Sequence, residues 1–145
     1  MSQLMLPTDA NTAGYVHGGT ILKIADTVAY VCASRHAGNY CVTASVDRVD
    51  FREPIKIGEL VTFKASVVFV GRTSMQVGIR VEAEDIRTCK TRHTNSCYFT
   101  CVALDRGGKP TSVPPLLLKT SDEKRRWREA EGRKKTFFLQ RSSRR

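Results

Sequence analysis

The chain has 145 residues, of which 41% are hydrophobic and 26% charged, as in a soluble globular protein with one domain and a sizeable core. No apolar run approaches the ~18 residues that span a bilayer, and the first residues lack the basic start and long apolar stretch of a signal peptide. Because five is an odd number of cysteines, we expect reduced thiols in the cytoplasm rather than a disulfide scaffold.

The net charge of +10 is unevenly distributed along the chain. Residues 119–145 hold 11 Lys and Arg against 4 Asp and Glu, whereas residues 1–118 hold 13 against 10. The body is therefore nearly balanced and the tail is basic. Any affinity for nucleic acid would have to come from that tail alone.

The first third of the chain predicts a short strand, a polar loop and one long buried helix. Residues 4–6 are apolar and precede Pro7, which removes a hydrogen-bond donor and ends the strand. Residues 19–36 form a helix whose apolar stripe is wider than that of a surface helix. We therefore expect a curved sheet to wrap around this helix, which ends at residues 37–39.

The middle of the chain has the period of two that is typical of strands. We expect strands at residues 42–51, 63–69, 75–83 and 91–104, separated by short turns. The first of them continues to the break at Glu53 and Pro54. The order of elements favours an α+β fold in which one antiparallel sheet surrounds one helix.

The last segment, residues 119–145, predicts a charged helix after a linker marked by three prolines. Thr120 to Glu123 form a capping box. We expect ion pairs four residues apart between Asp122 and Arg126, Arg125 and Glu129, and Glu129 and Arg133, and disorder at residues 140–145. The basic and aromatic side chains of this segment leave RNA or an anionic membrane as alternative partners. The ion pairs four residues apart instead favour a helix that packs on the body or on a neighbouring subunit.

The candidate site centres on the loop that opens the long helix. Gly18 and Gly19 allow a ligand to approach the backbone closely, and the unpaired N–H groups of a helix start suit an anion or a developing oxyanion. Asp26 lies within the apolar part of the helix, where a carboxylate is costly unless it is used. A glycine-rich turn, with an acid that complements the helix dipole, explains the same residues equally well.

Several other chemistries lack their motifs. Cys89, His93, Cys97 and Cys101 recur every four residues, but on a strand adjacent members lie ~13 Å apart, so we expect no metal site. The chain has no Gly-x-Ser-x-Gly elbow, no phosphate-binding P-loop and no Gly-x-Gly-x-x-Gly fingerprint. A catalytic base at His17 or His36 stays open, although a histidine beside a glycine pair is more often a structural residue.

Residues 1–118 resemble the hotdog-fold acyl-CoA thioesterases, most closely the cytosolic, brain-type acyl-CoA hydrolase branch. The segments that carry the resemblance are Asp9-Ala10-Asn11-x-x-Gly14-x-Val16-His17-Gly18-Gly19, Ile21-Leu22-Lys23-x-x-Asp26, Arg35-His36, Thr43-Ala44-Ser45-Val46-Asp47 and Phe51-x-x-Pro54-Ile55-x-x-Gly58. The resemblance implies a hotdog domain at residues 1–118, with the antiparallel sheet wrapped around the long central helix, and a C-terminal helix and tail at residues 119–145. It also implies hydrolysis of medium- or long-chain fatty acyl-CoA to fatty acid and CoA, without a metal or cofactor.

The same resemblance implies an active site between two subunits, with Asn11 from one and Asp26 from the other. Asp26 would act as a general base on water or attack the thioester directly, while Asn11 orients the water or the carbonyl. The N–H groups around Gly18 and Gly19 would hold the oxyanion. Arg72, Thr73 and Ser74 would bind the CoA phosphates, and Thr43 would line the pantetheine groove. The resemblance further implies a homodimer, assembled as a trimer of dimers or a tetramer.

Two other function classes remain open at this point. One is a hotdog acyl-CoA hydratase or dehydratase, which would need a histidine or an acid placed for α-proton abstraction in a different loop. The other is a non-catalytic protein that binds acyl-CoA or nucleic acid through the basic tail, although we do not expect a nucleic-acid partner. The acyl chain length cannot be deduced from the sequence.

Overall fold

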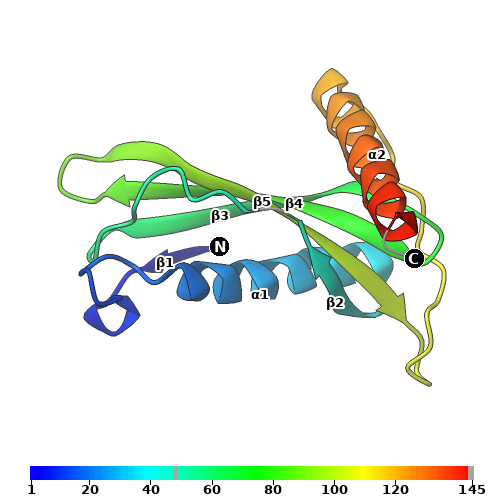
Figure 1. The fold of residues 1–145 in the computed structure, drawn as a ribbon, viewed down its shortest axis with the longest axis horizontal. Helices are drawn as coiled ribbons and strands as arrows, with labels where there is room; N and C mark the ends of the chain where they lie inside the picture. The colour runs from blue at the N-terminus through cyan, green and yellow to red at the C-terminus, as the bar shows by residue number, and fades with distance from the viewer. Residues whose placement is uncertain (48, 144–145) are drawn as a thin grey trace.

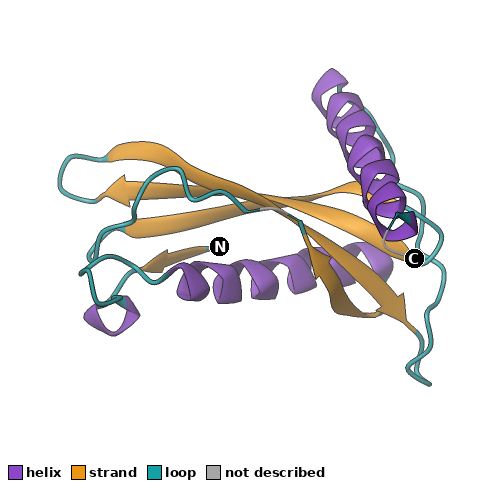
Figure 2. Ribbon diagram, in the orientation of Figure 1, coloured by secondary structure: helices purple, strands orange, loops and turns teal. Residues whose placement is uncertain are grey.

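A five-stranded antiparallel sheet separates two helices in the computed structural model, which describes residues 1–47 and 49–143 (Figures 1 and 2). Helix α1 (Gly18–Ala37) lies along one face of the sheet, and helix α2 (Ser121–Ser142) crosses the other face near one end. No helix among the described residues is long and apolar enough to cross a membrane.

The sheet contains β1 (Ser2–Leu4), β2 (Tyr40–Val46), β3 (Leu60–Val70), β4 (Ser74–Asp85) and β5 (Lys90–Leu104). Their order across the sheet is β1-β3-β4-β5-β2, so β1 and β2 are the two edges. Val67, Val77 and Phe99 lie side by side on β3, β4 and β5. A short 3-10 helix, η1 (Pro7–Asp9), precedes the loop that leads to α1.

Helix α1 has the boundaries that the sequence predicts, to within one residue at each end. His17 caps its start, and Gly38 ends it in a left-handed conformation with φ of 66°, which glycine adopts without strain. Seven side chains of α1 are buried against the sheet: Ile21, Ile24, Ala25, Val28, Ala29, Ala33 and Ala37. The predicted wrapping of the helix is therefore confirmed for the face that meets the sheet.

Two predicted strands differ from the structure. The first strand spans Ser2–Leu4 rather than residues 4–6, because Met5 turns into the core. Strand β2 ends at Val46 rather than continuing to residue 51. Beyond it, single hydrogen bonds from Asp47 to Tyr98 and from Arg52 to Thr94 replace the ladder. Residue 48 of the predicted strand lies outside the described residues.

Helix α2 begins with the predicted capping box, since Thr120 and Glu123 satisfy each other's backbone N–H groups. It packs on the sheet through Trp127, whose ring lies 4.4 Å from that of Phe69, and through Ala130, which is fully buried. The helix continues to Ser142, so the disorder predicted for residues 140–143 is wrong. Residues 144 and 145 of that prediction lie outside the described residues.

Only one of the three predicted ion pairs in α2 is present among the described residues. Arg125 contacts Glu129 at 2.9 Å and also approaches Asp122 at 3.7 Å. Arg133 turns toward the sheet instead of toward Glu129. Its guanidinium stacks on Tyr98, 3.7 Å from the ring centre, and lies 3.9 Å from Asp47. Contact with the sheet therefore outcompetes a pair on the solvent-exposed side of the helix, where such pairs contribute little.

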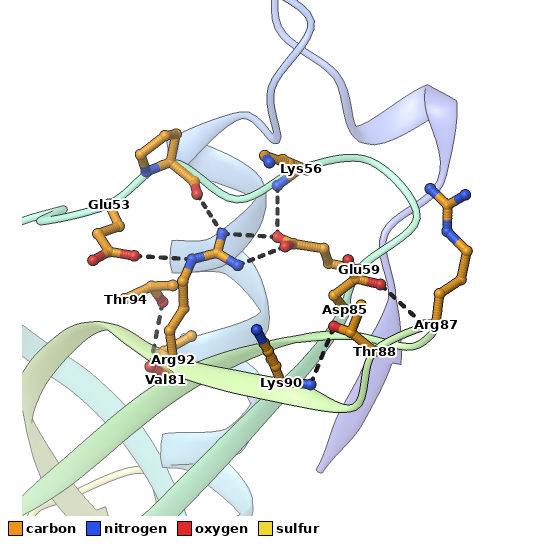
Figure 3. Close-up of polar contacts among 11 residues, drawn as sticks. Glu53, Lys56, Glu59, Val81, Asp85, Arg87, Thr88, Lys90, Arg92 and Thr94 are labelled. Carbon is orange, nitrogen blue, oxygen red and sulfur yellow. Dashed lines mark hydrogen bonds and ion pairs between the residues drawn. The ribbon is translucent and has the colours of Figure 1, made fainter.

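A partly buried ion pair, which we call the Arg92 clasp, holds the loop of residues 53–59 against β5 (Figure 3). It consists of Arg92 and Glu59, joined by hydrogen bonds of 2.5 Å and 2.9 Å. Burial alone would raise the pKa of Glu59. The hydrogen bonds from Arg92 and from the backbone of Lys56, together with the charge of Arg92, outweigh burial and lower this pKa below its ordinary value of 4.5.

The clasp is expected to make the stability of the fold depend on pH in the acid range. A carboxylate whose pKa is lower in the folded state than in the unfolded state stabilises the fold. Its full contribution to the free energy of unfolding is present above the unfolded-state pKa and is lost as the pH falls through the folded-state pKa. Urea unfolding of the wild type and of Glu59→Gln between about pH 3 and pH 7 measures the effect. The difference in the free energy of unfolding should be largest near neutral pH and shrink below pH 4.5. A difference that stays constant over this range would contradict the expectation.

Candidate active site

Asp26 lies on the side of α1 next to one edge of the sheet, and the residue is exposed. The hydroxyl of Thr43, on the edge strand β2, donates a hydrogen bond of 2.6 Å to Asp26 Oδ1. The expectation that Asp26 lies in the apolar part of the helix is therefore wrong within one chain. The helix face next to β2 is not covered there, because β2 is the last strand of the sheet.

A cavity of about 490 Å³ opens beside this pair, between α1 and β2. Its lining residues are Asp26, Thr27, Tyr30, Tyr40, Cys41, Val42, Thr43 and Cys101. Burial, with smaller contributions from nearby Cys41 and Asp26, raises the pKa of Cys101 to about 12. This thiol is thus protonated at neutral pH and a poor nucleophile. Asp26 is the only carboxylate in the lining, so it is the candidate for a base or nucleophile.

Asn11 lies in the loop before α1, and its side chain is held by the backbone of that loop. Oδ1 accepts hydrogen bonds from the N–H groups of Ala13, at 2.9 Å, and Tyr15, at 3.1 Å. Because both donors require an oxygen, they fix which end of the amide is which. Among the described residues Nδ2 has no hydrogen-bond partner. Asn11 therefore offers a fixed N–H donor for a ligand.

The two glycines at the start of α1 are not equivalent. The N–H of Gly19 donates to Nδ1 of its own cap, His17, at 3.0 Å, and the N–H of Thr20 donates to the carbonyl of His17 at 3.0 Å. The expectation that Gly19 supplies a free oxyanion donor is therefore wrong in the single chain. Within the described part of the chain, the N–H of Gly18 has no such partner. The ring of Phe51 lies 3.5 Å from the position that a Cβ on Gly18 would occupy.

Asp26 and the glycine pair are well separated on one chain. Asp26 is eight positions after Gly18 on the helix, and at a rise of 1.5 Å per position this corresponds to ~12 Å along the axis. A single thioester group is far too small to contact both. Gly18 and Asp26 of one chain therefore cannot act on the same thioester group.

Three predicted CoA contacts lie away from the cavity of Asp26. Arg72 and Thr73 form the connection between β3 and β4, and their carbonyls accept hydrogen bonds from Val113 and Ala103, each at 3.0 Å. Ser74 lines a cavity of about 100 Å³ next to α2. None of the three lines the cavity of Asp26.

The remaining candidates have structural roles. His17 caps α1, and Nε2 of His36 contacts the carbonyl of Pro114 at 2.9 Å, as expected of structural histidines. Cys97 is buried, which raises its thiol pKa to about 11, and His93 contacts Ser96. Within residues 1–47 and 49–143 no three His, Cys, Asp or Glu side chains come together as a metal site.

No pattern in the sequence indicated the contact between Thr43 and Asp26, or a role for Arg92 or Glu59. The contact joins residues 17 positions apart on different elements, so no local spacing reveals it. Arg92 and Glu59 are 33 positions apart. Their only signal was the presence of charged residues in segments that otherwise pack into the core.

A curled antiparallel sheet around one central helix, with an added C-terminal helix, is the hotdog fold. Residues 13–90 match the model of the thioesterase superfamily. The chain belongs to the thioesterase superfamily.

Relatives and solved structures share most of this chain. It is 51% identical to the protein VdlD of Helicobacter pylori over 92% of the chain and 76% of that protein. It is 38% identical to the rat cytosolic acyl coenzyme A thioester hydrolase over 90% of the chain, which spans only 35% of that larger protein.

Among solved structures, an apo hexameric acyl-CoA thioesterase matches with a TM-score of 0.93 and 36% identity, covering 100% of this chain and 92% of that one. An acyl-CoA hydrolase from Staphylococcus aureus, solved with butyryl-CoA and CoA, matches with a TM-score of 0.91 and 34% identity over 99% and 87%. It has also been solved with alanine in place of one aspartate, one asparagine or one threonine.

Proposed function

We propose that this protein hydrolyses fatty acyl-CoA of medium or long chain to a fatty acid and CoA, at a site shared by two copies of the chain. The observation that carries the proposal is the 2.6 Å hydrogen bond from Thr43 to Asp26 at the mouth of a cavity of about 490 Å³. This contact orients one carboxylate oxygen and leaves Oδ2 for chemistry. The relatives with this fold that act on acyl-CoA support the choice of substrate class.

The two routes open to Asp26 differ in the first bond that forms. As a general base, Oδ2 takes a proton from water while the water oxygen attacks the thioester carbon. As a nucleophile, Oδ2 attacks that carbon itself, and water then hydrolyses the mixed anhydride. In both routes the C–S bond breaks, and the CoA sulfur leaves as a thiolate that takes up a proton.

Asn11 and Gly18 supply the complementary half of the site in this proposal. The Nδ2 group of Asn11 and the N–H of Gly18 would hold the thioester oxygen as it gains negative charge. Fixed donors of this kind are effective because they need no rearrangement as the charge develops. Since Gly18 and Asp26 of one chain are separated by ~12 Å, the donors must come from a second copy.

The free edge of the sheet supports such a pairing. Strand β2 is an edge, and unpaired edges are commonly covered in native proteins. Next to Asp26, large apolar side chains are exposed on β2 and α1, namely Tyr30, Val31, Tyr40 and Val42. A second copy would bury this patch, and the hexameric relatives support assembly as a trimer of dimers. We also place the protein in the cytoplasm, the compartment in the name of the rat relative.

The Staphylococcus aureus hydrolase supports the choice of residues. Its three alanine variants replace an asparagine and an aspartate 15 positions apart, and a threonine 17 positions after the aspartate. Asn11, Asp26 and Thr43 have the same two spacings in this chain. The hydrogen bond from Thr43 to Asp26 favours Thr43 as a positioning residue for Asp26 over a role in the pantetheine groove.

The wild type is expected to release free thiol from a panel of acyl-CoA substrates, and Thr43→Val should lower kcat about 10- to 100-fold. Valine keeps the shape of threonine but cannot hold Asp26. Thiol release measured with a disulfide dye tests both points and separates hydrolysis from hydration. Ser45→Ala, on the same strand, is the matched control. Hydration of an enoyl-CoA without thiol release would contradict the proposed function.

A further inference from the structure

Arg92 uses its guanidinium to join three separate parts of one loop. Besides the two bonds to Glu59, Nη2 donates to the carbonyl of Pro54 at 2.7 Å, and Nε contacts Glu53 Oε2 at 2.9 Å (Figure 3). A guanidinium presents its donors in a rigid planar fork, so these contacts fix the loop in more than one direction. The loop of residues 53–59 is thus anchored on β5 at both of its ends.

Glu59 connects Arg92 to the backbone of the loop, because its side chain also binds a backbone N–H there. Its side chain is buried, with 6% of the residue exposed, and Oε2 also accepts the N–H of Lys56 at 2.8 Å. The adjoining backbone contacts the chain before α1 at two points. The N–H of Val16 donates to the carbonyl of Ile55 at 2.9 Å, and Tyr15 pairs with Lys56 across a single bridge.

Tyr15 in turn holds Asn11. Its N–H is one of the two donors to Asn11 Oδ1, and its carbonyl accepts the N–H of Asn11 at 2.7 Å. The loop around Asn11 belongs to no helix or strand, and Gly14 turns it with φ of 83°. The position of Asn11 therefore depends on Tyr15, whose own position depends on the loop that Arg92 holds.

We propose that Arg92 and Glu59 are positioning residues for the reaction and act by fixing Asn11 against the thioester. This inference rests on the proposed function of Asn11. Neither residue contacts the cavity of Asp26, so both act at a distance. A shift of ~1 Å in a positioning group can lower turnover by about 100-fold, which gives the clasp a role beyond holding the fold together.

A second ion-pair cluster provides a matched control. Glu82, on β4, contacts Lys64 at 2.8 Å and Arg80 at 2.7 Å. Like the clasp, it joins one glutamate to an arginine, here on the same strand, and it also includes a lysine on the neighbouring strand β3. Neither Lys64 nor Arg80 contacts the loop of residues 53–59 in the structure. Arg80→Lys is therefore the same chemical change as Arg92→Lys without the link to Asn11.

The test is a double-mutant cycle on hydrolysis of palmitoyl-CoA. Arg92→Lys keeps the charge but loses the fork, and should lower kcat about 10- to 100-fold with KM changed less than about twofold. Arg80→Lys should leave both unchanged. In an Asn11→Ala background, Arg92→Lys should lower kcat by less than about twofold, because the group it positions is already missing. Equal losses in both backgrounds, or no loss in either, would overturn the proposal.

A second measurement keeps the proposal testable without any turnover. Amide exchange of Ala13 and Tyr15, followed by NMR, reports whether Asn11 Oδ1 still accepts their N–H groups. Exchange at these two amides should accelerate in Arg92→Lys and in Glu59→Gln but not in Arg80→Lys. Unchanged exchange would overturn the proposal even if kcat falls. If the wild type releases no thiol, the proposed function fails, and the exchange experiment still decides whether the clasp fixes Asn11.

Discussion

Replacing Asp26 by alanine is expected to lower kcat for acyl-CoA hydrolysis by about 10²- to 10⁴-fold, the range associated with a lost general base. Asp26 is the only carboxylate that lines the cavity next to β2, and the thiols there are protonated. Asp26→Asn should be nearly as inactive, because an amide still accepts the hydrogen bond from Thr43 but cannot take a proton from water. Free-thiol release at saturating substrate measures the effect.

The loss should leave the fold intact. Asp26 is exposed, and the one side-chain hydrogen bond that it makes within the described residues, to Thr43, is worth about 1 kcal/mol. Urea unfolding should therefore show little change in the free energy of unfolding. Lys23→Ala, one turn earlier on an exposed position of α1, is the matched control and should keep wild-type turnover. Full activity of Asp26→Ala would remove Asp26 from the mechanism.

Mixing Asn11→Ala chains with Asp26→Ala chains is expected to give activity far above the residual turnover of either variant alone. In a random mixture half of the dimers are hybrids. Each hybrid pairs an intact Asn11 from one copy with an intact Asp26 from the other at one of its two sites. About a quarter of the wild-type sites should therefore be complete. Thiol release after a cycle of dissociation and reassociation measures the recovery.

The control for this experiment mixes Asp26→Ala chains with chains that carry both substitutions. These mixtures contain no intact Asp26 and should stay inactive. Exchange of subunits can be verified by mass, with one variant isotopically labelled. If the first mixture, with exchange verified, is as inactive as the second, the site is not shared between copies in the way that the ~12 Å separation of Gly18 and Asp26 requires.

The sequence predicted the long helix and its wrapping correctly because both depend on local signals. The apolar stripe of residues 19–36 is too wide for a surface, and Gly38 ends the helix as expected. The end of β2 could not be predicted, since residues 49 and 51 keep the period of two although the chain leaves the ladder after Val46. The alternation of apolar and polar residues indicates which side chains turn inward. It does not indicate whether the backbone still has a partner strand.

The site was predicted less completely than the fold. The position of Asp26 followed from the helix, but its exposure did not, because an apolar stripe on a helix does not distinguish the sheet from a neighbouring subunit. The availability of Gly19 was misjudged because the N–H is satisfied by His17, a residue considered as a possible base rather than as a cap. Contacts between distant segments, such as Arg92 with Glu59, leave no local pattern.

The ~12 Å between the helix start and Asp26 has a consequence for the life of each molecule. In the shared-site arrangement a newly synthesised copy folds before it can cleave any thioester, since it holds the charge-stabilising groups and the acid too far apart to cooperate. Hydrolysis then begins only on encounter with another copy, so its onset scales with expression level. Dilution, or a bulky substitution along β2, would abolish hydrolysis by separating the copies, although every reacting group would be unchanged.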